Sequence, residues 1–226
     1  MAIKLDYNFF YFITIMRIII VIIICLFVLL FIYGFCKSKI YLNKLKSVKL
    51  ENISPNTGDI ILFSTDNIKP NNILQIFYNH TPFTHVGIVY KKDGIVYLLE
   101  SHPTHYGDTS GIQLHPFYKR IKEYKGKLFY RRKKVSPSKN QEKLLENFVI
   151  EHNGYPEFPS TTTLLSNYIN RCMIGNEDLK PPYNCAEIVS IIFNKIFGHH
   201  TLRIGCEGPN LSSFDKVLEK PVLLKF

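Results

Sequence analysis

The longest hydrophobic stretch of the chain lies near its N-terminus. Residues 18–35 read IIIVIIICLFVLLFIYGF and contain no charged residue. As a helix this stretch is about 27 Å long, close to the thickness of a bilayer core. No small-residue cleavage pattern follows it. We therefore expect an uncleaved transmembrane helix at 18–36, preceded by a short N-terminal tail at 1–17.

The charged residues beside this stretch predict its orientation. Two basic residues precede it, and five lysines fall in the Lys-rich linker that we expect at 37–54. The positive-inside rule places the side with more cations in the cytosol. The sequence therefore predicts a single-pass membrane protein, in a host or virion membrane, with a cytosolic domain at 55–226.

Within this domain, strand-like apolar runs come first and helical periodicity follows. The strands are expected at 59–64, 84–90, 95–101 and 127–132. The Asp93-Gly94 pair is a strong signal for a hairpin between the second and third strands. Helices are expected at 138–154, 161–173, 185–197 and 209–219, with a helical or irregular segment at 73–78. This order predicts an α+β domain with an antiparallel sheet packed on helices.

The net charge of +10 resides in two local segments. Residues 1–49 carry +6 and residues 119–139 carry +9, so the rest of the chain is acidic. The 119–139 segment is either a strand with solvated flanks or a face that contacts anionic lipid. No recognition motif accompanies it, so we do not expect specific nucleic-acid binding.

The five cysteines do not follow the spacing of a zinc finger, which indicates reduced thiols. His102, His105 and Asp108 could suggest a metal site. They lack a helical frame and a clear third partner, so a polar loop is the preferred interpretation. We expect neither a metal nor a cofactor, and the sequence does not determine an oligomeric state.

One cysteine stands at the start of a predicted helix, in the stretch PPYNCAEIVSIIF. Asn184 is a suitable N-cap for this helix, and Glu187 completes a capping box. Cys185 therefore takes the first helical position, beside unpaired amides and the positive end of the helix dipole. Such a position favours the thiolate, which is the nucleophilic form. Read alone, Cys185 would more often be a buried structural thiol.

A histidine and a carboxylate complete the candidate site. His85 begins the strand THVGIVY and can act as the base for a helix-start cysteine. A hairpin turn centred on Asp93-Gly94 places residues 100–102 across from position 85. Glu100 is therefore placed to orient the second nitrogen of the histidine ring. His199 and His200 follow the predicted end of the cysteine helix, so they are expected to interact with the C-terminal end of the helix dipole.

The order GDIILF, THVGIVY, LLES and YNCAEIVSIIF resembles the circularly permuted NlpC/P60 papain-like superfamily over roughly residues 55–215. This group includes YiiX-like proteins, lecithin:retinol acyltransferase-like enzymes and a poxvirus branch. The resemblance implies Cys185 as nucleophile, His85 as base and Glu100 as the third member. Residues 154–163 depart from the pattern of the group, which leaves the substrate cleft unassigned. Together with the richness in Ile, Lys and Asn, the resemblance points to a large DNA virus.

The sequence thus predicts a thiol hydrolase or acyltransferase that forms a thioester on amide, peptide or lipid acyl groups. Backbone amides at the helix start would stabilise the oxyanion, and Tyr183 or Asn184 could add a donor. Asn184 cannot easily cap the helix and face substrate at once. The alternative is a catalytically inactive, membrane-tethered binding or scaffold protein with the same fold.

Overall fold

The computed structural model describes residues 7–64, 82–103, 110–168, 170, 181–199, 211 and 214–226. The chain divides into two compact units, Met1–Asn43 and Lys44–Phe226. Three predicted features fall wholly or partly outside the described residues. They are the segment at 73–78, the end of the helix at 161–173, and the first part of the helix at 209–219, of which residue 211 is described.

The first unit is built on one helix, α1, which spans Tyr7–Asn43. It runs through Arg17 at one end and through Lys37 and Lys39 at the other, so it does not keep the predicted bounds of 18–36. Within the part of the chain that the structure describes, no helix has the length and apolar character needed to cross a membrane. The predicted transmembrane helix and the single-pass localisation are therefore wrong by this finding.

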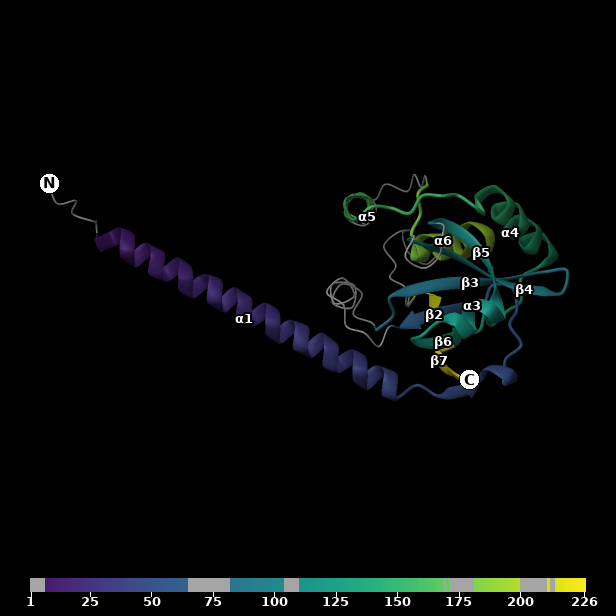
Figure 1. Cartoon of the computed structure of the whole chain (residues 1–226), viewed down its shortest axis with the longest axis horizontal. Helices are drawn as coiled ribbons and strands as arrows, with labels where there is room; N and C mark the ends of the chain where they lie inside the picture. Colours follow the sequence, from purple (N-terminus) through teal and green to yellow (C-terminus); the bar gives the residue numbers. More distant parts are fainter. Residues whose placement is uncertain are drawn as a thin grey trace. The chain divides into compact units, whose positions relative to one another are not determined.

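The second unit is organised around a seven-stranded sheet, drawn in Figure 1. Its strands are β1 Ser47–Lys49, β2 Ile60–Ser64, β3 His85–Lys92, β4 Ile95–His102, β5 Gly111–Pro116, β6 Lys127–Arg131 and β7 Val222–Lys225. Their order across the sheet is β1-β7-β6-β2-β3-β4-β5. The sheet is mixed, because β1 is parallel to β7 while every other neighbouring pair is antiparallel. The predicted antiparallel sheet is therefore correct except at this edge.

The predicted hairpin is confirmed with its turn. β3 and β4 pair from Ile88 with Leu99 to Lys92 with Ile95. Asp93 and Gly94 between them both have positive φ, at 51° and 79°. Two such residues make the tight turn whose twist matches that of the flanking strands. The hairpin therefore fixes the register that carries the candidate site.

Helices cover both faces of the central strands. On one face, helix α3, which spans Phe117–Glu123, contributes to a buried cluster with the strands. The cluster includes Ile61, Phe63, Val89, Leu98, Phe117 and Ile121. The alternate strand residues, among them Ile60, Leu62, Ile88 and Leu99, are also fully buried. Helix α6, which spans Cys185–Ile191, packs against β3 and β4.

Two further helices follow β6. Helix α4 spans Lys139–His152, within the helix expected at 138–154, and it starts with a capping box between Ser138 and Gln141. Helix α5 spans Thr161–Tyr168. After α6 the chain continues as a π-helical turn, η4, at Ile192–Ile196. The described residues 214–219 form turns rather than a helix, and β7 follows them.

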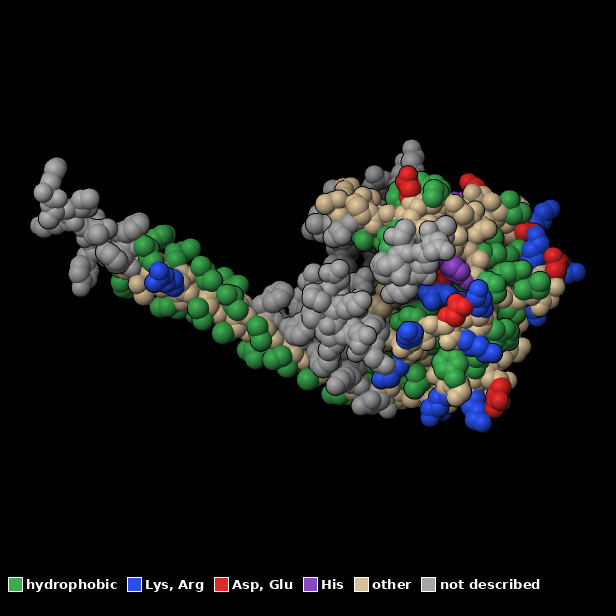
Figure 2. Space-filling view, viewed as in Figure 1, with side chains coloured by type: hydrophobic (Ala, Val, Ile, Leu, Met, Phe, Trp, Pro, Cys, Tyr) green, Lys and Arg blue, Asp and Glu red, His purple; other side chains and the backbone are tan. Residues whose placement is uncertain are grey.

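Two segments differ from their predicted form. The expected linker at 37–54 contains the end of α1, strand β1 and the 3-10 turn η1 at Leu50–Asn52. The basic segment at 119–139 divides between α3, β6 and the start of α4. Arg131 and Lys133 within it are buried. On the face shown in Figure 2, the Lys and Arg side chains are interspersed with hydrophobic and acidic ones.

Candidate active site

Cys185 is the first residue of α6, as predicted from its N-cap. The Asn184 side chain accepts a hydrogen bond from the Glu187 amide at 3.0 Å. In return the Asn184 amide donates to Glu187 Oε2 at 2.8 Å. These reciprocal bonds form the predicted capping box and fix the point at which the helix begins. Cys185 is buried with 9% of its surface exposed, so a small part of it can be reached.

The segment that precedes α6 is hydrogen-bonded to strand β4 of the sheet. Ser101 Oγ donates a hydrogen bond of 2.6 Å to the backbone carbonyl of Tyr183. Both residues are buried, and the Tyr183 ring lies against that of His152, with centroids 5.9 Å apart. The sheet and the cysteine are therefore connected two residues before the helix starts. This contact ties the position of Cys185 to the strand that carries Glu100.

His85 is the first residue of β3 and lies between the cysteine and the carboxylate. Its side chain is hydrogen-bonded to Cys185, and its Nε2 lies 2.9 Å from Glu100 Oε2. With Nε2 engaged by Glu100, Nδ1 is the ring nitrogen that can serve the thiol. Burial opposes the charged form of the ring, but the negative charge and hydrogen bonds of Cys185 and Glu100 outweigh it. They raise the pKa of His85 to about 9.

Glu100 is buried on β4 and holds two basic partners. It meets His85 through Oε2, and Arg120 of α3 donates to both of its oxygens. Burial favours the protonated carboxyl, but the hydrogen bonds and charges of His85 and Arg120 outweigh it. They lower the pKa of Glu100 to about 2. The carboxylate is therefore ionised at neutral pH although Glu100 is buried, with 1% of its surface exposed.

A glycine makes room for this carboxylate beside β3. A Cβ atom placed on Gly87 would come within 2.9 Å of Glu100 Cγ and 2.8 Å of Leu98 Cγ. Carbon atoms in ordinary contact are about 3.5–4.0 Å apart. The absence of a side chain at Gly87 therefore lets Glu100 lie over the strand and reach His85.

The structure thus brings Cys185, His85 and Glu100 into one hydrogen-bonded series, as their sequence positions predict. Asn184 uses its side-chain oxygen for the helix cap. Tyr183 uses its backbone carbonyl to bind Ser101. The role of either residue toward an oxyanion stays a prediction. Such a series of thiol, imidazole and carboxylate is suited to nucleophilic catalysis.

Arg120 is the residue of this cluster that sequence reasoning missed. Its position in the basic segment at 119–139 indicated a solvated or lipid-facing cation. The exposed fraction of its side chain is 10%, because the side chain turns inward to Glu100. Arg120 lies on a short helix whose Phe117 and Ile121 are buried, one turn before Tyr124. This spacing is the sequence signal that could have identified Arg120 as an inward-facing residue.

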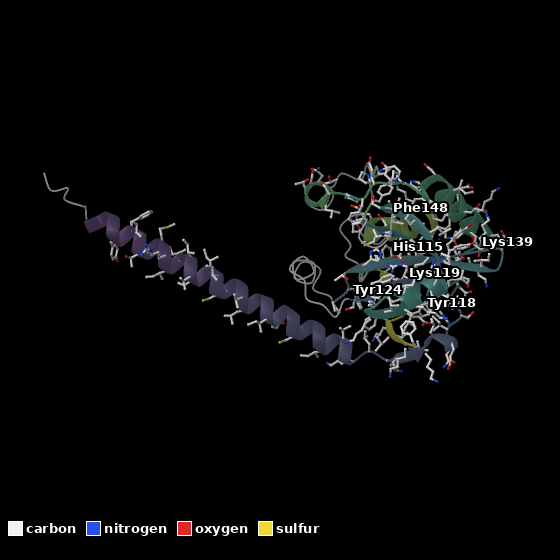
Figure 3. All side chains as sticks on the ribbon, in the orientation of Figure 1. His115, Tyr118, Lys119, Tyr124, Lys139 and Phe148 are labelled. Carbon is white, nitrogen blue, oxygen red and sulfur yellow. The ribbon has the colours of Figure 1, made fainter. Side chains whose placement is uncertain are left out.

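A second pair of histidines lies near Glu100. His102 Nε2 and His115 Nε2 are 3.0 Å apart, and His102 Nδ1 donates to the backbone carbonyl of Pro103. Burial lowers the pKa of both rings. His115 is labelled in Figure 3. Among the described residues, no group of three or more His, Cys, Asp or Glu is placed to hold a metal ion.

Three other residues named at the sequence level fall outside the described residues: His105, Asp108 and His200. His199 is described, and its backbone amide donates to the Phe193 carbonyl at 2.9 Å. This bond satisfies one of the carbonyls at the end of the α6–η4 helix.

No protein-family model and no curated protein matches the chain. Among solved structures, the chain is similar to the crystal structure of metalloprotein yiiX from Escherichia coli O157:H7. The two share 20% sequence identity with a TM-score of 0.45, over 66% of this chain and 70% of the yiiX chain. The resemblance to the wider permuted NlpC/P60 superfamily and to its poxvirus branch stays a prediction.

Proposed function

We propose that the protein is a cysteine hydrolase or acyltransferase, with Cys185 as nucleophile, His85 as general base and acid, and Glu100 as the orienting carboxylate. The observation that supports this proposal is the buried hydrogen-bonded series of the three side chains. Each alone has an ordinary structural explanation. Their contact at the start of a helix provides a nucleophile, a base and a group that orients the base.

In the first step Cys185, whose thiol proton has passed to His85, attacks the acyl carbon of the substrate as the thiolate. A C–S bond forms, and the carbonyl electron pair moves to oxygen to give a tetrahedral oxyanion. The Cys185 backbone amide, at the first position of α6, is a donor suited to this charge. As the oxyanion collapses, the bond from carbon to the leaving nitrogen or oxygen breaks. His85 gives its proton to the leaving group, and a thioester remains on Cys185.

In the second step the neutral His85 takes a proton from water or from another acceptor. The acceptor oxygen or nitrogen attacks the thioester carbon, the C–S bond breaks, and Cys185 departs as the thiolate. The imidazolium that results lies again beside the thiolate and Glu100. Water as acceptor makes the overall reaction a hydrolysis, and another nucleophile makes it an acyl transfer.

Glu100 supports both steps through its charge. A buried imidazolium is costly unless a negative group lies beside it. Glu100 provides this charge at Nε2, which leaves Nδ1 directed to the thiol and the reacting atoms. The substrate class within this chemistry is an acyl group on nitrogen, as in amides and peptides, or on oxygen, as in lipid esters.

The test is the reactivity of Cys185 in the full chain. Iodoacetamide alkylation is followed against pH, and mass spectrometry of the Cys185 peptide separates this thiol from the others. Exposed Cys36 in the same sample is the internal reference. The expected result is a Cys185 rate at neutral pH above that of Cys36, lost in His85→Ala and reduced in Glu100→Gln.

The same samples are then incubated with p-nitrophenyl acetate, and the acetyl thioester is located on Cys185. Panels of peptide amides and of lipid esters follow, to distinguish the two substrate classes. If the alkylation rate of Cys185 were the same with and without His85, the enzyme proposal would be rejected. A binding or scaffold protein with this fold would then be the better description.

A further inference from the structure

We infer that Arg120 is a positioning residue for the proposed reaction, which acts through Glu100 and sets the pH range over which the Cys185–His85 pair is ready to react. This inference rests on the proposed function. It adds a fourth residue, from a different helix, to the series of three that the sequence predicted.

Two nitrogens of Arg120 contact both carboxylate oxygens of Glu100. Arg120 Nε lies 2.9 Å from Oε1 and 3.2 Å from Oε2, and Nη2 lies 3.0 Å from Oε2. A planar guanidinium that holds both oxygens fixes the rotation of the carboxylate as well as its place. Oε2 is also the oxygen that faces His85. Arg120 therefore fixes the orientation in which the carboxylate meets the imidazole.

Arg120 is itself held by aromatic rings. Its guanidinium carbon lies 5.0 Å from the centroid of the Phe63 ring and 5.8 Å from that of Tyr124. Both distances lie within the range of a cation–π contact. The Phe63 ring also lies 4.9 Å from the His85 ring. One buried side chain of β2 thus contacts both the base and the residue that holds its carboxylate.

The charges of the cluster show what Arg120 contributes. With the thiolate, the imidazolium, the carboxylate and the guanidinium, the cluster has no net charge. Without Arg120 it carries one net negative charge in a buried place, so it takes up a proton at a higher pH. The guanidinium stays charged throughout, so its effect is on the coupled thiol, imidazole and carboxyl, whose combined behaviour the reactivity of the thiol reports. Losing Arg120 should therefore narrow the pH range over which Cys185 is reactive, by raising its lower limit.

A lysine at position 120 would be an incomplete replacement. Its ammonium keeps the charge but cannot hold both carboxylate oxygens in the fork geometry of arginine. We therefore expect Arg120→Lys to keep part of the effect, and Arg120→Met to lose it while keeping an apolar stem against Phe63 and Tyr124.

The experiment measures alkylation of Cys185 against pH in the full chain for the wild type, Arg120→Met and Arg120→Lys. The matched control is Lys119→Met on the same helix, since Lys119 is 70% exposed and lies 3.9 Å from Glu123. Lys119 and Tyr124 are labelled in Figure 3. The expected result is an acid limb that rises by roughly one pH unit in Arg120→Met, equivalent to about tenfold in rate on that limb. Arg120→Lys should move it less, and Lys119→Met should not move it.

A second comparison tests whether Arg120 acts through Glu100. Arg120→Met is measured again in the Glu100→Gln background, where its effect on the acid limb should be much smaller. An equal effect in both backgrounds would mean direct action on the thiol and would overturn the inference. The inference would also be overturned if Arg120→Met lowered the Cys185 alkylation rate equally at every pH. Such a result would indicate loss of structure, with no change in the pH at which the thiol becomes reactive.

Folding is checked by circular dichroism in every variant. If Arg120→Met does not fold, Arg120→Lys carries the test, and an acid limb identical to that of the wild type overturns the inference. The proposed function is tested separately by the dependence of the wild-type rate on His85. A wild type that passes this test beside unaffected Arg120 variants would reject the role of Arg120 alone.

Discussion

Replacing Gly87 by alanine should separate Glu100 from His85 without removing either group. The added Cβ would lie 2.8 Å from Leu98 Cγ, 2.9 Å from Glu100 Cγ and 3.0 Å from Leu98 Cδ1. Ordinary contact needs about 3.5–4.0 Å, so these atoms must move by roughly 1 Å. Both neighbours are fully buried, and their Cγ atoms lie near the backbone, so neither can turn away freely.

The size of the effect follows from these contacts. Inserting a methyl group into a packed interior costs about 1–3 kcal/mol. For a chain of this length, each kcal/mol lowers Tm by roughly 2–4 °C. A shift of Glu100 by about 1 Å also lengthens its 2.9 Å bond to His85 beyond hydrogen-bonding range. The Cys185 alkylation rate at neutral pH should then fall by about tenfold, as for a titration shift of one pH unit.

The assay combines thermal unfolding with alkylation of the Cys185 peptide, for Gly87→Ala in the wild type and in a Leu98→Ala background. Leu98→Ala removes the two leucine contacts and leaves the contact with Glu100. We expect the second background to recover stability toward that of Leu98→Ala alone, while alkylation remains slow. A Gly87→Ala protein with the stability and reactivity of the wild type would refute this account of the glycine.

Three further predictions follow from the buried polar groups. Because the pKa of Glu100 falls from 4.5 to about 2 in the folded state, its contribution to stability is complete above pH 4.5 and is lost as the pH falls toward 2. The free energy of unfolding measured in urea should therefore fall with pH between these values, and Glu100→Gln should reduce this dependence on pH. Ser101→Ala removes the hydroxyl that donates to the buried Tyr183 carbonyl, so the free energy of unfolding should fall by about 1–3 kcal/mol. Cys185 alkylation should also slow, and an unchanged alkylation rate would contradict the connection between β4 and α6. Asp59 accepts from the amides of Asn56 and Lys133 and from the Tyr130 hydroxyl, so Asp59→Asn should lower urea stability by about 1–3 kcal/mol, while Asp93→Asn in the exposed turn should stay within about 0.5 kcal/mol of the wild type.

The central hairpin and the helix start could be predicted because their signals are local. Asp93-Gly94 determines a turn, the turn determines the register, and the register brings Glu100 near His85. In the same way, Asn184 and Glu187 mark where α6 begins, which places Cys185. Each inference needs a few neighbouring residues and the regular geometry of a strand or helix.

The parts that could not be predicted depend on contacts between distant segments. Arg120 reads as one cation among many in a basic segment, and its inward position depends on how α3 lies over β2 and β4. The parallel pairing of β1 with β7 joins segments separated by most of the chain. The hydrophobicity of residues 18–35 alone predicted a membrane span, whereas the helix that forms extends past both predicted bounds.

The pairing of β1 with β7 also has a consequence for the order in which the protein acquires its structure. During translation the ribosome makes β1 before any other strand of the sheet and β7 after all the others. β1 lies at the edge of the sheet beside β7, so its place is completed after the rest of the sheet has been synthesised. Nascent chains stalled before residue 222 should therefore hold the central hairpin but leave residues 47–49 open to added protease, and release of the full chain should protect them.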